Sequence, residues 1–501
     1  MEVKYRSTRG DQTEYTASQA VLQGLAKDGG LFVPDRIPAL DCPMAELAEL
    51  SYQETAYEVM KRFLTDYTEE ELKACIRAAY DEKFDTPEIV PVVKKDGAYY
   101  LELFHGATIA FKDMALSILP HLMVTAARKN QCKNEIVILT ATSGDTGKAA
   151  MAGFADVPGT RIIVFYPQDG VSPIQEKQMV TQKGDNTAVV AIRGNFDDAQ
   201  SGVKRIFADE ELGDKMKAAG FQFSSANSIN IGRLVPQVVY YVYAYAKLLK
   251  AGEIQDNEVV NVTVPTGNFG NILAAYYAKQ MGVPIGKLIC ASNENKVLFD
   301  FFSTGTYDRN RPFVLTSSPS MDILISSNLE RLIFQIASEN DREEACRVDA
   351  SFMKQLTETG AYTITDAMRE RLGDFYGNYA TEAETAGAIR RMYEKEGYVM
   401  DTHTAVASCV YEKYVNETKD TAKTMIASTA SPYKFARSVM EALGEACVGK
   451  DDFQLVDELE RLSGVIVPKA VEEIRTAPVR HTRVCDAENM KEEVCQILGI
   501  H

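Results

Sequence analysis

The pattern of hydrophobic and polar positions changes character near residue 90. Before that point, apolar residues recur at helical spacing over 44–62 and 68–81. From about residue 95, short apolar runs rich in β-branched residues alternate with segments of helical periodicity. Six of these runs are predicted strands: 135–142, 161–166, 187–192, 259–264, 287–292 and 424–428. Strands separated by helical segments imply βαβ units, so the pattern predicts a mostly parallel α/β fold with an N-terminal α/β cap.

The remaining segments complete this prediction. Residues 170–186 and 304–320 are predicted loops, and the second is rich in Ser, Pro and Arg. Residues 341–356 and 382–396 are predicted helices, and 450–501 is a largely helical tail.

Composition excludes several classes of protein. The 501 residues suffice for about three domains, and 46% hydrophobic with 25% charged residues is ordinary for a soluble globular protein. The net charge of −17 argues against a nucleic-acid partner. No apolar run reaches the roughly 18 residues of a membrane span, and the N-terminus lacks a signal core. The nine cysteines and five histidines are scattered without C-x-x-C, so we expect reduced thiols, no metal site and a cytoplasmic location.

Lys112 stands out among the chemical candidates. It follows an apolar strand-like run and a Gly-containing turn, and lies between Phe111 and Asp113. A lysine held against apolar groups has a lowered pKa, and its neutral amine forms Schiff bases with carbonyl cofactors. The alternative is a surface lysine whose stem lies on apolar neighbours.

Two strand-to-helix junctions are rich in small and hydroxyl residues. The first, 140–148, includes Ser143, Asp145 and Thr146, which suit either an anion site or an ordinary helix N-cap. The second, 265–271, has the pattern G-x-x-G and matches neither a Walker loop nor a dinucleotide fingerprint. A nest of backbone N–H groups for a single phosphate ester is the remaining functional reading of the second junction.

Three further segments carry polar side chains. Residues 224–233 place amides and hydroxyls before Arg233, which suits a phosphate or carboxylate or, alternatively, a capped helix with Arg233 exposed. Thr429 follows the last predicted strand and has a neutral hydroxyl for a ring nitrogen, or belongs to a simple turn. Residues 401–404 indicate a helix N-cap, with His403 as a local hydrogen-bonding residue.

A Schiff-base lysine, a nest for one phosphate and a neutral partner for a ring nitrogen together describe a pyridoxal phosphate site. On these motifs the chain resembles threonine synthase, a family of fold-type II pyridoxal phosphate enzymes. The matching runs lie in the family's order at 5–10, 28–34, 104–113, 141–147, 225–233, 265–271 and 429–435. The resemblance implies a tryptophan synthase β-like fold with an N-terminal threonine-synthase-type domain (1–90), a catalytic region of two interleaved lobes (91–435) and a helical C-terminal extension (436–501).

The resemblance also assigns roles to individual residues. Lys112 is expected to carry pyridoxal 5'-phosphate as a Schiff base and to act as proton shuttle. The residues expected to bind the cofactor are Lys112, Asp145, Gly267, Asn268, Phe269, Gly270, Asn271 and Thr429. Those expected to bind substrate are Ser143, Thr146, Asn227, Ser228 and Arg233. Ala107, Ser431 and Asn271 depart from the Pro, His and acid usual at these places in the family.

The implied activity is conversion of O-phospho-L-homoserine and water to L-threonine and phosphate, the last step of threonine biosynthesis. It proceeds by γ-elimination followed by β-addition of water. The alternatives are a related lyase that releases a 2-keto acid, such as a serine/threonine dehydratase or a threonine-synthase-like phospho-lyase, and a binding protein without cofactor. Asn227, Ser228 and Arg233 favour the first reading, because a dehydratase needs no phosphate site. We expect a monomer or homodimer with no membrane partner.

Overall fold

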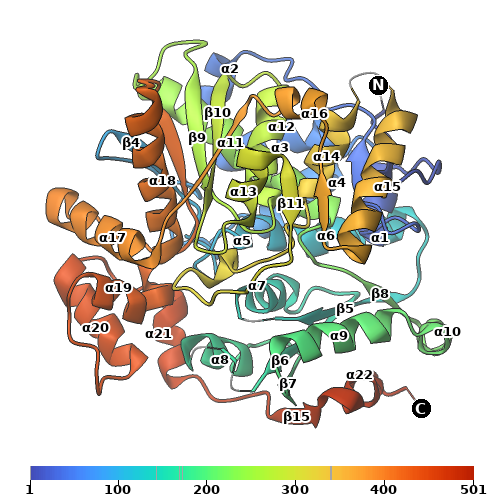
Figure 1. Cartoon of the computed structure of the whole chain (residues 1–501). Coiled ribbons are helices and arrows are strands. Elements are labelled where there is room, and N and C mark those ends of the chain that lie inside the picture. Colours follow the sequence, from blue (N-terminus) through green and yellow to red (C-terminus); the bar gives the residue numbers. More distant parts are fainter. Residues whose placement is uncertain (1, 143, 169, 172, 339–340, 501) are drawn as a thin grey trace.

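Two sheets of parallel strands with helices on both faces form most of the molecule (Figure 1). The computed structural model describes residues 2–142, 144–168, 170–171, 173–338 and 341–500. The predicted α/β fold is therefore confirmed, and all six predicted strands are present within two residues of their expected limits.

The larger sheet has the strand order β13-β10-β9-β14-β4-β3, and only the edge pair β3–β4 is antiparallel. Its strands are β3 (Val92–Lys95), β4 (Ala98–Glu102), β9 (Val260–Pro265), β10 (Ile285–Ser292), β13 (Phe375–Tyr379) and β14 (Thr424–Ser428). Val262 and Leu288 face the core that contains α11 (Ile231–Lys250) and α12 (Gly270–Gln280). Ile289 and Ile426 face the opposite core, with α17 (Glu382–Glu396) and α18 (Thr402–Thr418). Burial on both faces explains why β10 and β14 contain apolar residues at successive positions.

The smaller sheet is wholly parallel, in the order β15-β7-β6-β5-β8. Its strands are β5 (Glu135–Ala141), β6 (Thr160–Pro167), β7 (Thr187–Arg193), β8 (Phe221–Ser224) and β15 (Arg483–Asp486). Ile138 and Val164 share a core with α7 (Asp145–Phe154). Val137 and Phe165 pack with α9 (Phe196–Phe207), α10 (Glu210–Ala218) and α22 (Met490–Leu498). We call the parts built on the two sheets the larger and the smaller lobe.

The N-terminal part packs against α11 of the larger lobe. It contains β1 (Tyr5–Ser7), α1 (Ala17–Gln23), β2 (Phe32–Pro34), α2 (Met44–Ala48), α3 (Tyr52–Phe63) and α4 (Glu69–Ala79). The helix predicted over 44–62 is divided in two, because Ser51 forms a capping box with Glu54 and starts a new helix. The second predicted helix, 68–81, corresponds to α4.

The prediction of a loop over 170–186 is wrong in its central part. Residues Pro173–Val180 form α8, which packs against α7 and buries Ile174 and Met179. The segment contains two glutamines, a glutamate and a lysine, so its two buried apolar residues give too weak a periodic signal to predict a helix. The loop predicted over 304–320 is irregular except for β11 (Thr306–Asp308) and the start of a 3₁₀ turn, Pro319–Met321.

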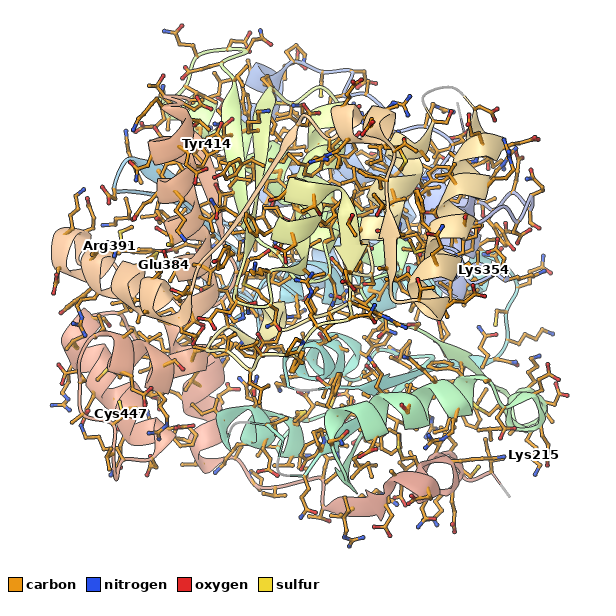
Figure 2. The ribbon with its side chains drawn as sticks, viewed as in Figure 1. Lys215, Lys354, Glu384, Arg391, Tyr414 and Cys447 are labelled. Atoms are coloured by element: carbon orange, nitrogen blue, oxygen red, sulfur yellow. The ribbon has the colours of Figure 1, made fainter. Side chains whose placement is uncertain are left out.

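The remaining helices and strands connect or cover the two lobes. They are α5 (Asp113–Leu116), α6 (Leu119–Lys129), α13 (Val297–Thr304), α14 (Leu329–Ala337), α15 (Arg342–Glu358), β12 (Ala361–Thr363) and α16 (Asp366–Arg371). The predicted helices 341–356 and 382–396 correspond to α15 and α17. Exposed side chains such as Lys215, Lys354 and Arg391 project outward from α10, α15 and α17 (Figure 2).

The C-terminal tail is helical except at one place. Helix α19 (Ala436–Ala442) lies against α17, and α20 (Asp452–Ser463) packs against α19. Helix α21 (Lys469–Thr476) lies next to α8, and α22 lies beside α9 (Figure 1). The exception is β15, which pairs in parallel with β7 and extends the smaller sheet. The boundaries 90 and 435 between the expected domains stay a prediction. No helix in the described ranges is long and apolar enough to span a membrane.

Candidate active site

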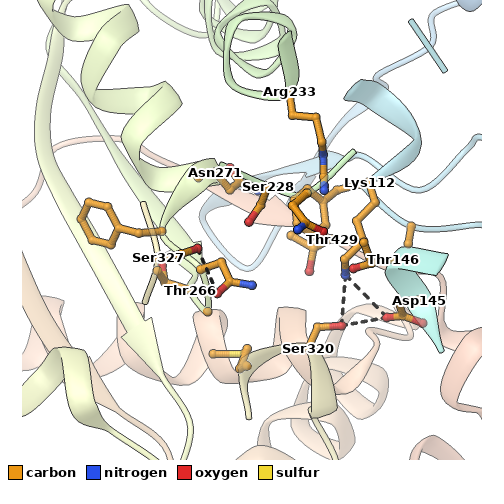
Figure 3. Close-up of a pocket in the computed structure, with 18 of the residues that line it drawn as sticks. Lys112, Asp145, Thr146, Ser228, Arg233, Thr266, Asn271, Ser320, Ser327 and Thr429 are labelled. Carbon is orange, nitrogen blue, oxygen red and sulfur yellow. Dashed lines mark hydrogen bonds and ion pairs between the residues drawn. The ribbon is translucent and has the colours of Figure 1, made fainter. Parts of the chain in front are cut away.

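A cavity of about 450 Å³ is lined by residues of both lobes (Figure 3). Every predicted site residue within the described ranges lines it: Lys112, Asp145, Thr146, Asn227, Ser228, Arg233, Gly267, Asn268, Phe269, Gly270, Asn271 and Thr429. Ser143, the remaining predicted residue, lies outside the described residues. Five segments far apart in the sequence therefore contribute to a single cavity.

Lys112 is held in place by the backbone on both sides. Phe111 N donates to Thr429 O (2.8 Å), and Ser431 N donates to Ile109 O (3.0 Å), which joins the lysine segment to the loop after β14. The carboxylate of Asp113 accepts from Thr108 N (2.8 Å) and Thr108 Oγ1 (2.6 Å) and closes the preceding turn. These bonds fix the direction in which the Lys112 side chain enters the cavity.

The amine of Lys112 is buried beside a carboxylate and a hydroxyl (Figure 3). Its side chain is 11% exposed, so the surface alternative is wrong. Nζ donates to Ser320 Oγ (3.3 Å) and lies 3.7 Å from Asp145 Oδ2. Burial lowers the pKa of Lys112, although Asp145 acts in the opposite direction. A lowered pKa increases the fraction of neutral, nucleophilic amine.

Asp145 is the acidic residue of the cavity lining, and its carboxylate has several polar partners. Its Oδ2 accepts from Ser320 Oγ (2.7 Å), and its Oδ1 lies 3.2 Å from Lys434 Nζ and accepts from Gln175 Nε2 (3.0 Å). Burial alone would raise the pKa of this carboxyl, but Lys434 and Lys112 outweigh it and hold the pKa well below its usual range. Asp145 is thus a fixed negative charge, not a proton donor.

The predicted phosphate nest lies between β9 and α12. Phe269 precedes the first residue of α12 in the left-handed conformation, with φ of 66°. A Cβ at Gly267 would lie 2.5 Å from Ser320 O, so the close approach of these two loops requires glycine. Asn271 is buried, its Nδ2 has no partner among the described atoms, and its Oδ1 accepts from Tyr241 Oη. An unpaired buried donor at a helix N-terminus fits an anion.

Arg233 is the second cation that enters the cavity (Figure 3). Asn230 does cap α11, as one alternative expected, but Arg233 is 3% exposed instead of facing solvent. Its Nη1 donates to Ala226 O (3.0 Å), and its Nε has no partner among the described atoms. Burial lowers the pKa of Arg233 to about 10, and no carboxylate of the described chain forms an ion pair with it. A buried guanidinium without a carboxylate is costly unless an anionic ligand binds there.

The expected N-cap at 401–404 is present. The Asp401 carboxylate accepts from the backbone of His403 and Thr404 and contacts His403 Nδ1 (2.7 Å). His403 Nε2 accepts from Ser320 N (3.1 Å), which fixes the Nδ1-protonated tautomer and holds Ser320 toward Lys112. His403 is therefore a local hydrogen-bonding residue, as expected.

Sequence reasoning missed two residues in this network. Ser320 lies in a segment predicted as a plain loop, and Lys434 lies five residues after Thr429 without any local pattern that marks it. Lys434 falls inside the matching run 429–435, which is the one signal that could have singled it out. Both residues act through Asp145, a contact that joins sequence positions far apart.

The cavity fits a phosphate ester that carries an aldehyde. Lys112 offers an amine with lowered pKa, the 267–271 loop offers the unpaired donor Asn271 Nδ2, and the buried Thr429 hydroxyl offers a neutral partner for a ring nitrogen. Fold and site together define a fold-type II enzyme that depends on pyridoxal phosphate.

Comparison with known proteins supports this class and narrows it. The family model described as pyridoxal-phosphate dependent enzyme matches residues 93–430. Two others, threonine synthase N terminus and threonine synthase C-terminal, match residues 4–80 and 404–493. The chain belongs to the threonine synthase family.

Individual relatives and a solved structure also indicate this family. Threonine synthase from Schizosaccharomyces pombe is 39% identical over 469 residues, covering 88% of this chain and 90% of the relative. Human threonine synthase-like 1 is 41% identical over 439 residues, 85% of this chain, and the match spans 58% of the human protein's length. The crystal structure of PLP-bound threonine synthase from Brucella melitensis superposes with a TM-score of 0.86 at 34% identity, covering 99% of both chains.

Proposed function

We propose that this chain is a threonine synthase that converts O-phospho-L-homoserine and water to L-threonine and inorganic phosphate. The observation that carries the proposal is Arg233, a buried cation in the same cavity as Lys112 and without a carboxylate partner among the described residues. A substrate phosphate satisfies it, whereas serine and threonine, the substrates of a dehydratase, carry an α-carboxylate but no phosphate to place there.

Each part of the cavity has a role in holding the cofactor. Lys112 forms the covalent attachment, the loop from Gly267 to Asn271 binds the phosphate, and Thr429 donates or accepts at the ring nitrogen. Bound pyridoxal phosphate supplies an electron sink for negative charge that develops on the substrate carbons. Asp145, kept ionised by Lys434, provides fixed negative charge beside Lys112.

Lys112 is the residue that moves protons. As a free amine, Nζ would accept the proton from the substrate α-carbon, and its lowered pKa favours the neutral form that this transfer needs. Ser320 Oγ and Asp145 keep Nζ within the cavity and stabilise its protonated form. Nζ would then move a proton from the β-carbon to the γ-carbon as the γ-phosphate leaves. Water would add its hydroxyl at the β-carbon, the α-carbon would regain a proton from Nζ, and the proton left over from water would go to the released phosphate.

Asn227, Ser228, Thr146 and Arg233 are proposed to hold the substrate phosphate before and after it leaves. The Arg233 guanidinium donates a hydrogen bond to Ala226 O. This bond holds the guanidinium next to the segment that carries Asn227 and Ser228. Binding of phosphate through these residues places the γ-carbon of the substrate toward Lys112. That placement favours γ-elimination of phosphate over reactions of unphosphorylated amino acids.

The test is to supply the purified holoenzyme with O-phospho-L-homoserine and identify the amino-acid product. We expect L-threonine and phosphate in equal amounts. Formation of 2-oxobutyrate instead would overturn the proposal in favour of a phospho-lyase that releases a keto acid. Lys112→Ala is the control, because it removes the proposed proton shuttle and should abolish release of phosphate.

A further inference from the structure

One face of helix α9 borders the cavity and has no part in the roles described above. Phe196, Gln200 and Lys204 all line the cavity and follow one another at intervals of four residues. Residues four apart lie on one face of a helix, so these three form a continuous stripe. Ala199 and Val203 pack instead into the core of the smaller lobe. The stripe is therefore the part of α9 that faces the cavity.

Lys204 is the available cation of this stripe. Its side chain is exposed, and the described part of the chain shows no ion pair for it. The cavity lining contains two other cations, Lys112 and Arg233, against the single carboxylate of Asp145. Lys112 is paired with Asp145 and is committed to the cofactor, which leaves Arg233 and Lys204 for the substrate.

The charge of the substrate phosphate exceeds what Arg233 alone can balance. A phosphate monoester carries a charge of about −1.5 to −2 near neutral pH. One guanidinium contributes a single positive charge, and the chain as a whole has a net charge of −17 that disfavours anions. A second cation at the cavity therefore balances the part of the phosphate charge that Arg233 leaves uncompensated.

We propose that Lys204, assisted by Gln200, completes the substrate phosphate subsite from the smaller lobe. This inference rests on the proposed function and adds a specificity-determining residue to it. Arg233 lies in the first turn of α11, which packs in the larger lobe, whereas Lys204 belongs to α9 of the smaller lobe. The phosphate is thus held between the lobes, and a substrate without phosphate gains neither contact.

The test compares Lys204→Gln with Arg205→Gln. Arg205 is the next residue on the same helix, is also exposed, carries the same charge and does not line the cavity. For Lys204→Gln we expect the KM for O-phospho-L-homoserine to rise about tenfold, the loss typical of one charge-assisted contact, with kcat changed less than about threefold. Arg205→Gln should leave both constants unchanged, and Lys204→Arg should restore most of the affinity.

A second measurement separates this inference from the proposed function. Titration calorimetry with inorganic phosphate on the holoenzyme requires no turnover, and we expect about tenfold weaker binding in Lys204→Gln than in the wild type or Arg205→Gln. Equal phosphate affinity in the wild type and Lys204→Gln overturns the inference, as does an equal rise of KM in both variants. If the wild type produces no threonine, the proposed function fails while the phosphate comparison still decides the role of Lys204.

Discussion

The ammonium group of Lys434 lies 3.2 Å from Oδ1 of Asp145, and the Lys434 side chain is fully buried. Lys434 Nζ also donates to Thr108 O (2.9 Å), in the turn that precedes Lys112. This lysine therefore connects the Lys112 segment with the start of α7, and it keeps the carboxylate of Asp145 ionised inside the protein.

Lys434→Met should destabilise the protein through Asp145. Removal of the closer partner leaves the buried Asp145 carboxylate with Lys112, 3.7 Å away, as its remaining cation, at a cost of about 3 kcal/mol. Urea unfolding of the apoprotein measures this loss. The double variant Lys434→Met/Asp145→Asn removes the remaining charge and should recover most of the stability. If the double variant is no more stable than Lys434→Met, the pair is not the cause.

Lys112→Ala should remove covalent cofactor binding while leaving the fold intact. We expect loss of the visible absorption band and of the cofactor that borohydride fixes to the protein in the wild type. Lys148→Met is a stringent control, because Lys148 is a second buried lysine and burial lowers its pKa to about 8. Fixation of cofactor to Lys148 instead of Lys112 would contradict the site assignment.

Arg233→Met should weaken substrate binding without destabilising the fold. Loss of the guanidinium contact is expected to raise the KM for O-phospho-L-homoserine about 100-fold, whereas cofactor content stays unchanged. Because Arg233 is buried without a carboxylate partner among the described residues, an apolar side chain should leave the free energy of unfolding unchanged or raise it by about 1 kcal/mol. Steady-state kinetics and urea unfolding give the two quantities. A large loss of stability with unchanged KM would mean that Arg233 is structural.

His105 should make stability depend on pH in the alkaline range. Its ring lies 2.6 Å from Asp85 Oδ1 through Nδ1 and 2.9 Å from Glu102 Oε2 through Nε2. Burial opposes the charged ring, but these two carboxylates outweigh it and raise the pKa of His105 to about 9. A raised pKa stabilises the fold fully below the unfolded value near 6.5, and this contribution disappears as pH rises through about 9.

The comparison of wild type with His105→Gln measures this contribution. Between about pH 6 and about pH 10 the wild type should lose about 2 kcal/mol more unfolding free energy than the variant, after allowance for the exposure of Asp85. Urea unfolding at several pH values provides the curves. Parallel curves for the two proteins would show that the charged ring contributes nothing.

The elements that sequence patterns predicted well are those with a strong local signal. β5 and β6 are apolar at successive positions because both faces of their sheet are covered. Helix α8 and strand β15 lack such a signal: half of the residues of α8 are polar, and β15 (Arg483–Asp486) is a short edge strand whose place depends on β7. Their formation depends on tertiary contacts, which periodicity does not report.

The features of the candidate site likewise divide into those that the local sequence predicts and those that depend on tertiary contacts. The glycine-rich loop at 267–271, the amide-rich segment before Arg233 and the position of Lys112 are properties of the sequence. Each is local, because backbone N–H groups at a helix N-terminus and small residues act within a few positions. The direction of Arg233, which one alternative placed in solvent, was decided by how α11 packs in the larger lobe.

The sequence by itself thus determined the alternation of strands and helices, the loops able to bind anions and the lysine able to bind an aldehyde. Only the tertiary structure decided that Lys434 neutralises Asp145, that Ser320 contacts Lys112 and that Lys204 lines the same cavity as Arg233. The physical reason is the sequence separation of the residues that interact. Helix caps and hydrophobic periodicity involve residues that are close together in the sequence. Burial, desolvation and the pairing of charges depend on segments that meet only when the two lobes have folded together.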